Sequence, residues 1–175
     1  MFSPELVERA SHIRLLLLDV DGVLTDGRII YAEYGDELKF FDVQDGAGLG
    51  FWSRVGLKSA IVTARTSRLL KRRAKELQID FLAQDCLAKL SMYQRLLKHY
   101  RLNDAQVCVI GDDLMELPML RRAGLAVAVA NAVEDVKRAS HYVTRRSGGH
   151  GAVREVIDLI LRAKGLWDQM LQSYQ

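Results

Sequence analysis

Short apolar runs alternate with longer amphipathic stretches along most of the chain. Six runs rich in Val, Ile and Leu are typical of buried parallel strands, at 13–20, 58–63, 81–83, 107–111, 126–129 and 142–144. Helical periodicity predicts helices at 48–55, 67–77, 88–100, 118–123, 133–139 and 151–172. The alternation predicts an α/β, Rossmann-like fold with a mainly parallel sheet and helices on both faces. Ligands are then expected beyond the carboxyl ends of the strands.

One segment interrupts this alternation. Residues 28–32 and 37–43 have the pattern of two strands, so we predict a hairpin inserted at about 27–43. Its apolar residues fall on both faces, as the neighbours Ile29 and Ile30 show. An isolated hairpin is marginally stable in water, and apolar residues on both faces need partners. We therefore expect a flap that packs on another subunit; the alternative is that it extends the main sheet.

Composition limits the class of protein. The chain has 175 residues, of which 49% are hydrophobic and 27% charged, so a single domain over residues 1–175 is expected. The net charge is +3, and the charges are largely interspersed, which favours small anionic ligands over nucleic acid.

The cysteines and the lengths of the apolar runs indicate the cellular compartment of the protein. Cys86 and Cys108 are far apart in sequence, which argues against a disulfide scaffold and a zinc site and suits a reducing environment. No apolar stretch reaches the roughly 18 residues that span a bilayer. We expect a cytoplasmic protein without a membrane partner.

The sequence Asp-Val-Asp-Gly-Val-Leu-Thr-Asp-Gly at 19–27 follows the first predicted strand. In an extended chain, residues two apart project to the same side, so Asp19 and Asp21 can reach one small volume. Gly22 allows the backbone to turn sharply there. Two carboxylates this close favour a metal ion or a shared proton. The alternative is an ordinary Asp-Gly turn whose carboxylates cap the backbone.

Polar residues also follow the other predicted strands: Thr63, Lys89, and Asp112 with Asp113. Each one alone is explained by a helix cap, a turn or a solvated side chain. Together they lie at the same edge of one sheet, where strand ends converge on a crevice. We therefore expect them to form one site with Asp19.

This set of groups suits phosphoryl transfer. A carboxylate nucleophile and a phosphate repel each other, so a divalent cation and a lysine are needed to neutralise the site. Asp19 and Asp112 can hold Mg²⁺, while Thr63 and Lys89 hold phosphoryl oxygens. Asp21 would protonate the leaving alkoxide and later accept a proton from water.

These motifs in this order resemble the haloacid dehalogenase superfamily of phosphohydrolases. The segments 44–48 (Gln-Asp-Gly-Ala-Gly) and 147–155 (Ser-Gly-Gly-His-Gly-Ala-Val-Arg-Glu) further resemble a subgroup acting on 3-deoxy-D-manno-octulosonate 8-phosphate. The resemblance implies a Mg²⁺-dependent phosphomonoesterase in the synthesis of the lipopolysaccharide inner-core sugar. It also implies a homotetramer without a large cap domain, whose hairpins cover neighbouring active sites.

The resemblance implies a role for each matching residue. Asp19 is the nucleophile, Asp21 the acid and base, and Asp113 a partner behind the metal ligands. The implied metal ligands are Asp19, Asp21 through its backbone carbonyl, and Asp112. Thr63 and Lys89 hold the phosphate. The implied substrate contacts are Asp21, Asp42, Val43, Gln44, Asp45, Gly46, Arg65, Arg73 and Lys89.

Two positions depart from the family pattern. Ala64 replaces a glycine near the phosphate, and Gly50 removes a basic side chain that relatives often carry. A nine-carbon sialic-type sugar acid 9-phosphate, or another phosphomonoester, is therefore an alternative substrate. A phospho-receiver module and a non-catalytic scaffold are alternatives of another class, but a receiver has its acidic pair first, and a scaffold needs none of these charges.

The loop 148–151 allows two interpretations. Its glycines either present N–H groups to an anion or serve as an ordinary helix entry. His150 in this loop is expected to face solvent.

Overall fold

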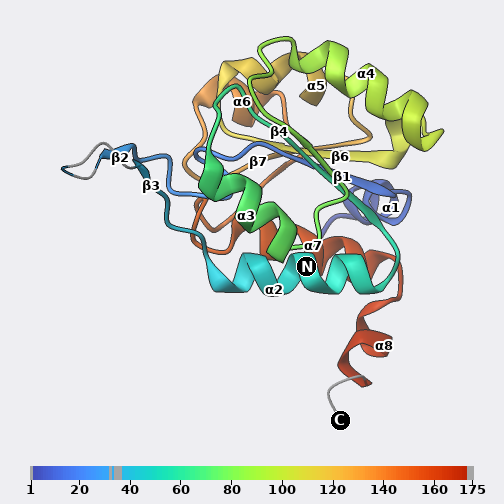
Figure 1. The fold of residues 1–175 in the computed structure, drawn as a ribbon. Helices are drawn as coiled ribbons and strands as arrows, with labels where there is room; N and C mark the ends of the chain where they lie inside the picture. The colour runs from blue at the N-terminus through green and yellow to red at the C-terminus, as the bar shows by residue number, and fades with distance from the viewer. Residues whose placement is uncertain (1, 32, 34–36, 173–175) are drawn as a thin grey trace.

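The computed structural model describes residues 2–31, 33 and 37–172, and its centre is a six-stranded sheet (Figure 1). All neighbouring strands of this sheet run parallel, in the order β5-β4-β1-β6-β7-β8. The strands are β1 (Leu15–Leu18), β4 (Lys58–Val62), β5 (Phe81–Ala83), β6 (Val107–Gly111), β7 (Leu125–Ala128) and β8 (Tyr142–Val143). The α/β fold with a parallel sheet is thus confirmed.

Helices cover both faces of the sheet. Helices α4, α5 and α6 lie on one face, and α2 and α7 lie on the other, with α1 packed on α7 (Figure 1). The helices are α1 (Pro4–Ser11), α2 (Val43–Arg54), α3 (Arg68–Glu76), α4 (Lys89–Tyr100), α5 (Leu117–Leu120), α6 (Glu134–Arg138), α7 (Ala152–Ala163) and α8 (Trp167–Gln172), with 3-10 turns η1 (Asp104–Gln106) and η2 (Leu114–Glu116). Among the described helices, none has the length and apolar character needed to cross a bilayer.

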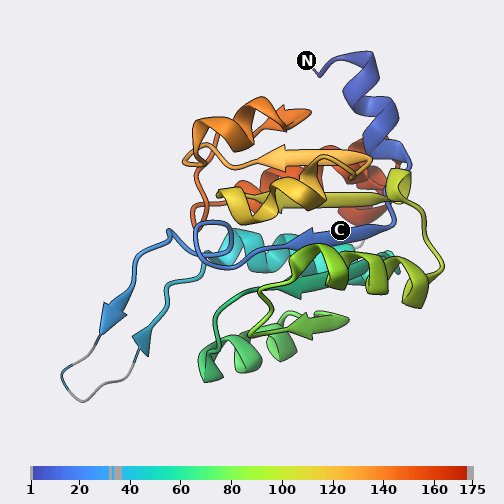
Figure 2. The same ribbon diagram turned by 90° about the horizontal axis from the view of Figure 1, so that it is seen from above.

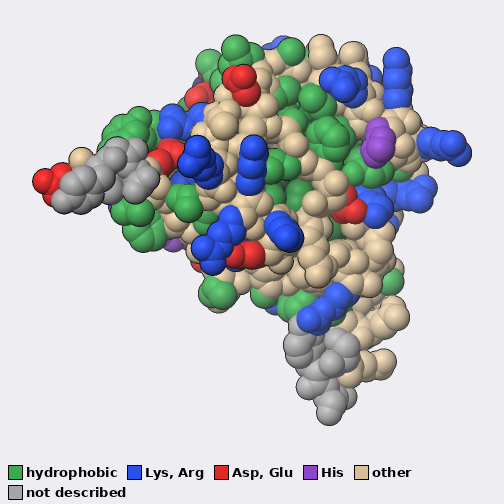
Figure 3. All heavy atoms as spheres, viewed as in Figure 1, with side chains coloured by type: hydrophobic (Ala, Val, Ile, Leu, Met, Phe, Trp, Pro, Cys, Tyr) green, Lys and Arg blue, Asp and Glu red, His purple; other side chains and the backbone are tan. Residues whose placement is uncertain are grey.

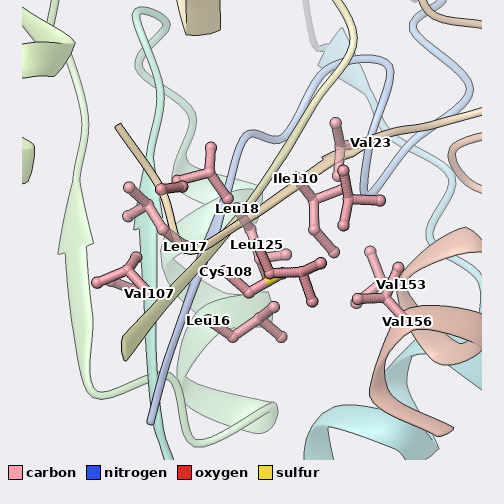
Figure 4. Packing of buried hydrophobic residues seen from close by; sticks show 14 of the residues in the cluster. Leu16, Leu17, Leu18, Val23, Val107, Cys108, Ile110, Leu125, Val153 and Val156 are labelled. Atoms are coloured by element: carbon pink, nitrogen blue, oxygen red, sulfur yellow. The ribbon is translucent and has the colours of Figure 1, made fainter. Parts of the chain in front are cut away.

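Strand β1 is the centre of the core. Its four leucines are at most 1% exposed, and Leu18 pairs with Ile61 on one side and Ile110 on the other. Val153 and Val156 of α7 pack toward this sheet (Figure 4). Full burial of such a side chain stabilises the fold by about 1.5–3 kcal/mol. The ends of β4, β1 and β6 are therefore held rigidly next to one another.

Two predicted helices differ clearly from those in the structure. Helix α2 begins at Val43 instead of 48, because the Asp42 side chain caps it by accepting hydrogen bonds from the N–H groups of Gln44 (2.6 Å) and Asp45 (3.1 Å). The single helix predicted over 151–172 is two helices, because Gly165 adopts φ +69° between α7 and α8. An L-residue with a side chain would rarely adopt this conformation.

The predicted hairpin is present as a separate two-stranded sheet. Strand β2 (Ile30–Tyr31) pairs antiparallel with β3 (Glu37–Leu38), and the pair projects away from the rest of the molecule (Figure 2). The alternative that the hairpin extends the main sheet is therefore wrong. The second strand ends at Leu38 instead of 43. The predicted turn positions 34–36, and residue 32, lie outside the described residues.

Candidate active site

The predicted catalytic residues meet at the carboxyl ends of three adjacent strands. Asp19 follows β1, Thr63 follows β4 and Asp112 follows β6. They share a pocket of about 180 Å³, which is lined by Asp19, Asp21, Thr63, Ala64, Arg65, Lys89, Asp112, Asp113, Met115 and Glu116. The structure thus brings together the acids, the hydroxyl and the amine that were predicted to form one site.

The loop after β1 is fixed by a buried threonine. Thr25 is 2% exposed; its hydroxyl donates to the Val20 carbonyl (3.3 Å) and accepts from the N–H groups of Gly22 (3.4 Å) and Gly27 (3.3 Å). Gly22 has φ +92° and leaves the space that the Asp112 carboxylate occupies. The conformation of this loop therefore decides whether Asp112 can lie close to Asp19.

Lys89 is the buried cation of the pocket. It begins α4, is 4% exposed, and its Nζ donates to Asp19 Oδ1 at 2.7 Å and to Glu116 Oε1. Burial alone would lower the pKa of Lys89, but the charges of Asp19 and Glu116 outweigh it and raise that pKa. Lys89 is therefore held as an ammonium ion beside Asp19.

Glu116 is a site residue that the sequence analysis missed. It is 1% exposed, and its Oε2 accepts a hydrogen bond from the Asp113 N–H at 3.1 Å. Asp113 lies just before the turn η2, and its Oδ1 accepts a hydrogen bond from the Leu114 N–H at 2.7 Å. The spacing of Asp112 and Glu116, four residues apart at the start of a helical turn, is the signal that could have identified it.

The carboxylates of the pocket are suited to a divalent cation. One carboxylate oxygen from each of Asp19, Asp112 and Glu116 lies within 4.8 Å of the others. Burial, together with the neighbouring carboxylates, raises the pKa of Asp112 to about 7. Burial also raises the pKa of Asp19 to about 6, although Lys89 opposes this shift. A hard cation with oxygen ligands would offset this excess of negative charge.

Thr63 and Arg65 lie on the loop after β4. Thr63 is 2% exposed, its N–H donates to the Ala83 carbonyl (3.0 Å), and its Oγ1 accepts from the Arg65 N–H (3.3 Å). Ala64 lies between them and lines the pocket. This loop therefore contributes a hydroxyl group and a guanidinium group to the lining of the pocket that Asp21 also lines.

Asp21 is held by cations from two other segments. Lys39, just after β3, forms an ion pair with Asp21 Oδ1, and Arg65 Nε lies 3.7 Å from Asp21 Oδ2. Glu37 accepts a hydrogen bond from Arg65 Nη2 at 2.7 Å and lies 3.5 Å from Lys39 Nζ. The sequence analysis missed Lys39 and Glu37, because a contact between a hairpin and the loop before it has no local pattern.

The remaining predicted substrate residues lie outside this pocket. Arg73 and Val43 line a groove of about 510 Å³ between the base of the hairpin and α3, where basic side chains gather on the surface (Figure 3). A Cβ atom on Gly46 would lie 2.6 Å from Arg73 Nη2, so the guanidinium of Arg73 packs directly on that glycine. Asp42 caps its own helix, and Gln44 accepts a hydrogen bond from Arg146.

The carboxylate of Asp45, a predicted substrate contact, accepts hydrogen bonds from the protein itself. It is 2% exposed and accepts hydrogen bonds from the N–H groups of Arg154 (2.7 Å) and Gly151 (3.3 Å) at the start of α7. Burial raises the pKa of Asp45 to about 6, although these hydrogen bonds oppose the shift. Its carboxylate therefore joins the start of α2 to the start of α7.

The glycine-rich loop supports the loop after β1. The Gly148 N–H donates to Asn131 Oδ1 (2.7 Å), and the Gly149 N–H donates to the Val23 carbonyl (3.0 Å). A Cβ atom on Gly148 would lie 1.7 Å from the Gly22 carbonyl oxygen. These N–H groups bind the protein itself, which favours the structural interpretation of the loop. His150 is exposed, as expected.

Comparisons with known proteins agree with this geometry. The haloacid dehalogenase-like hydrolase family matches residues 73–157. The 3-deoxy-D-manno-octulosonate 8-phosphate phosphatase KdsC of Yersinia pestis is 46% identical over 160 residues, which cover 91% of this chain and 86% of that protein. The protein of the same name from Escherichia coli K12 is 42% identical over 167 residues, covering 95% and 89%.

A solved structure is similar over the whole chain. The 3-deoxy-D-manno-octulosonate 8-phosphate phosphatase of Moraxella catarrhalis, solved with a magnesium ion, a phosphate ion and a KDO molecule, has a TM-score of 0.96. It is 41% identical, and the match covers 99% of this chain and all of that one. The chain therefore belongs to the 3-deoxy-D-manno-octulosonate 8-phosphate phosphatase family of the haloacid dehalogenase-like hydrolases.

Proposed function

We infer that this chain is a Mg²⁺-dependent phosphatase that hydrolyses 3-deoxy-D-manno-octulosonate 8-phosphate to the free sugar acid and phosphate. This reaction belongs to the synthesis of the lipopolysaccharide inner-core sugar. The observation that carries the inference is the grouping of Asp19, Thr63, Lys89 and Asp112 in one pocket, in a chain 46% identical to a phosphatase of that name. Membership of a hydrolase family favours an enzyme over a receiver module or a scaffold.

Asp19 is the proposed nucleophile. One of its oxygens accepts the Lys89 hydrogen bond, and the other attacks phosphorus, forming an O–P bond as the bond to the sugar oxygen breaks. Thr63 and Lys89 hold phosphoryl oxygens during this step and compensate their negative charge. The product of the step is an aspartyl phosphate on Asp19.

Asp21 is the proposed acid and base. The electron pair of the breaking P–O bond remains on the sugar oxygen, which takes a proton from Asp21. Asp21 then accepts a proton from the water that attacks the aspartyl phosphate, and the O–P bond to Asp19 breaks. One water is consumed for each monoester, and Asp19 and Asp21 return to their initial states.

The residues present suit a magnesium ion. Asp19 and Asp112 would hold the ion, with the backbone carbonyl of Asp21 as a further proposed ligand, because hard oxygen donors are what Mg²⁺ prefers. Glu116 serves as a counter-charge to Lys89, since both of its oxygens accept hydrogen bonds already. When bound, the ion would reduce the repulsion between the phosphate and the carboxylates.

Two arginines are proposed to recognise the sugar acid. Among the described residues, Arg65 Nε and Arg73 Nε are buried nitrogen atoms without a hydrogen-bond partner. A buried donor without a partner costs free energy, which an anionic ligand would recover. Arg65 lines the pocket, and Arg73 lines the groove with Val43. The carboxylate of the sugar acid is the anion that we assign to such donors.

The groove residues are proposed to act across a subunit interface. The hairpin and the start of α2 leave large apolar side chains on the surface, since Tyr31 is 71%, Phe40 63% and Val43 80% exposed. Covering such a surface favours association of subunits. A homotetramer built through the hairpin would let residues 42–46 and Arg73 of one subunit approach the pocket of another. Sedimentation of the wild type and of Phe40→Ser would test this association.

The substrate assignment has a direct test. Phosphate release from the octulosonate 8-phosphate is compared with release from a nine-carbon sugar acid 9-phosphate, each with and without a chelator. We expect faster turnover of the 8-phosphate than of the 9-phosphate. The chelator should abolish this turnover, and added Mg²⁺ should restore it. Faster turnover of the 9-phosphate would reassign the substrate. Gly50 is the reason for testing that alternative, because it removes a basic side chain that relatives often carry.

A further inference from the structure

Lys39 interrupts the exposure of its neighbours at the end of β3 and just beyond it. Its neighbours Leu38 and Phe40 are 45% and 63% exposed, whereas the side chain of Lys39 is 2% exposed. Apolar side chains therefore face solvent while the charged one is buried. Burying an ammonium group is costly unless it is paired, and the pair here is with Asp21 Oδ1. The hairpin thus delivers a cation to Asp21, which lines the pocket.

The ion pair makes the two oxygens of Asp21 different. Oδ1 accepts from the Lys39 ammonium, and an oxygen used in this way is a poor place for a proton. Oδ2 lies 3.7 Å from Arg65 Nε, which is beyond hydrogen-bonding distance. Within the part of the chain that the structure describes, no group donates a hydrogen bond to Oδ2, so this oxygen keeps its lone pairs available for a proton although Arg65 lies nearby.

We propose that Lys39 is a positioning residue of the phosphatase reaction, which holds Oδ1 of Asp21 so that Oδ2 carries the transferred proton. The proposal rests on the acid and base role given to Asp21 above. As the P–O bond breaks, the leaving sugar oxygen keeps the electron pair and takes the proton from Oδ2. The attacking water later returns a proton to the same oxygen. Lys39 keeps its own protons throughout.

Glu37 and Arg65 keep Lys39 in place. Glu37 lies 3.5 Å from Lys39 Nζ and accepts from Arg65 Nη2 at 2.7 Å, so the hairpin is tied to the loop after β4 as well. Together with Asp21, these three side chains close a ring of alternating charge. The orientation of the Asp21 side chain therefore depends directly on the position of the hairpin.

The test compares leaving groups. Asp21→Asn, Lys39→Met and Lys39→Arg are each measured on the octulosonate 8-phosphate, on an alkyl phosphate without a carboxylate, and on 4-nitrophenyl phosphate. The nitrophenolate leaves without a proton, so kcat of Lys39→Met should fall at least about tenfold more on both alkyl esters than on the aryl ester. Asp21→Asn should show the same pattern. Lys39→Arg should restore most of the lost activity, because it keeps a charged donor.

Controls separate this role from a structural one. Lys137→Met removes another lysine that is paired with a carboxylate, Glu134, and that does not line the pocket, so it should leave all three activities unchanged. Thermal unfolding establishes that each variant is folded. If Lys39→Met does not fold, Lys39→Gln serves the same comparison, since it keeps a neutral donor.

Three results would overturn the inference. Equal losses on all three esters for the Lys39 variants, with a leaving-group effect for Asp21→Asn, would leave the proposed function intact and reject the positioning role. A raised KM on the octulosonate ester alone would assign Lys39 to the substrate carboxylate instead. Equal losses for Asp21→Asn itself would reject the acid role of Asp21, and the inference with it.

Discussion

A Cβ atom on Gly22 would lie 2.0 Å from Asp112 Oδ2. The two residues are far apart in sequence but follow the adjacent strands β1 and β6. The approach is possible only because residue 22 has no side chain, and its φ of +92° also favours glycine. The distance between the two main carboxylates of the pocket therefore depends on one glycine.

Comparing Gly22→Ala with Gly56→Ala should separate the displacement of the Asp112 carboxylate from backbone strain. The added methyl group displaces the Asp112 carboxylate, so we expect at least about tenfold weaker Mg²⁺ binding by calorimetry, equivalent to about 1.4 kcal/mol. Gly56→Ala is the matched control, because Gly56 has φ +77° but a Cβ atom added there would meet no atom within 4 Å. Similar losses of Mg²⁺ affinity in both variants would contradict the proposed role of Gly22.

Removing the buried ammonium should destabilise the fold as well as abolish activity. Lys89→Met leaves Asp19 and Glu116 without their cation, and breaking a buried ion pair in this way costs about 3 kcal/mol or more. Chemical denaturation should show a larger loss in chelator than in Mg²⁺, because the bound ion offsets part of the negative charge.

A second variant tests whether charge is the cause. Lys89→Met combined with Glu116→Gln removes one of the two carboxylates, and it should recover part of the stability without recovering activity. If the double variant is no more stable than Lys89→Met alone, repulsion between the carboxylates is not the reason for the loss.

Asn131 should matter although it contacts none of the reacting groups. Its Nδ2 donates to the Gly22 carbonyl (3.3 Å), and its Oδ1 accepts from the Gly148 N–H (2.7 Å). Asn131→Ala should lower the free energy of unfolding by about 1 kcal/mol and reduce kcat, because the loop after β1 loses its support. Asn103→Ala, which removes a capping side chain at η1, should reduce stability without reducing kcat. An unchanged kcat in Asn131→Ala would argue against loop support.

The pH dependence of stability should report on Asp45. Its pKa is raised by burial from 3.8 to about 6, so the folded state binds the proton more tightly than the unfolded state. The stability from this group is fully present below about pH 4 and is lost as the pH rises to about 6. The difference is on the order of 3 kcal/mol.

Asp45→Asn should remove that dependence while keeping one capping oxygen. The free energy of unfolding of the variant, measured relative to the wild type, should therefore rise between pH 4 and pH 7. Asp80→Asn provides a comparison at an exposed ion pair with Lys58. A constant difference between Asp45→Asn and the wild type over this range would show that Asp45 titrates normally.

The sheet and the strand ends could be predicted from local pattern. Apolar runs identify buried strands, and the side chains at their carboxyl ends must share one edge, which placed Asp19, Thr63 and Asp112 together. Other features depend on contacts between distant segments. The Asp42 cap starts α2 despite the low helix propensity of its glycines. Helix α1 was not predicted, although Ser3 and Pro4 are a typical helix start.

The site residues that were missed have the same explanation. Lys39 looks like a solvated strand residue until the hairpin folds back on Asp21, and Glu116 looks like a surface residue of a short helix. The predicted contacts of residues 42–46 with substrate remain a prediction, because none of these residues lines the pocket, whereas Val43 lines the groove with Arg73. The proposed oligomer would bring such segments of different subunits together, and sequence pattern does not give its geometry.

The central claim is that Asp19 becomes phosphorylated. Its most direct test is an acid quench of the enzyme during turnover of octulosonate ester labelled in the phosphate, followed by mapping of the label onto peptides. We expect the label on the peptide that contains Asp19, its loss in Asp19→Asn with the fold retained, and its accumulation in Asp21→Asn if water attack is slowed. Undiminished phosphate release by Asp19→Asn, or label on a different residue, would contradict the account.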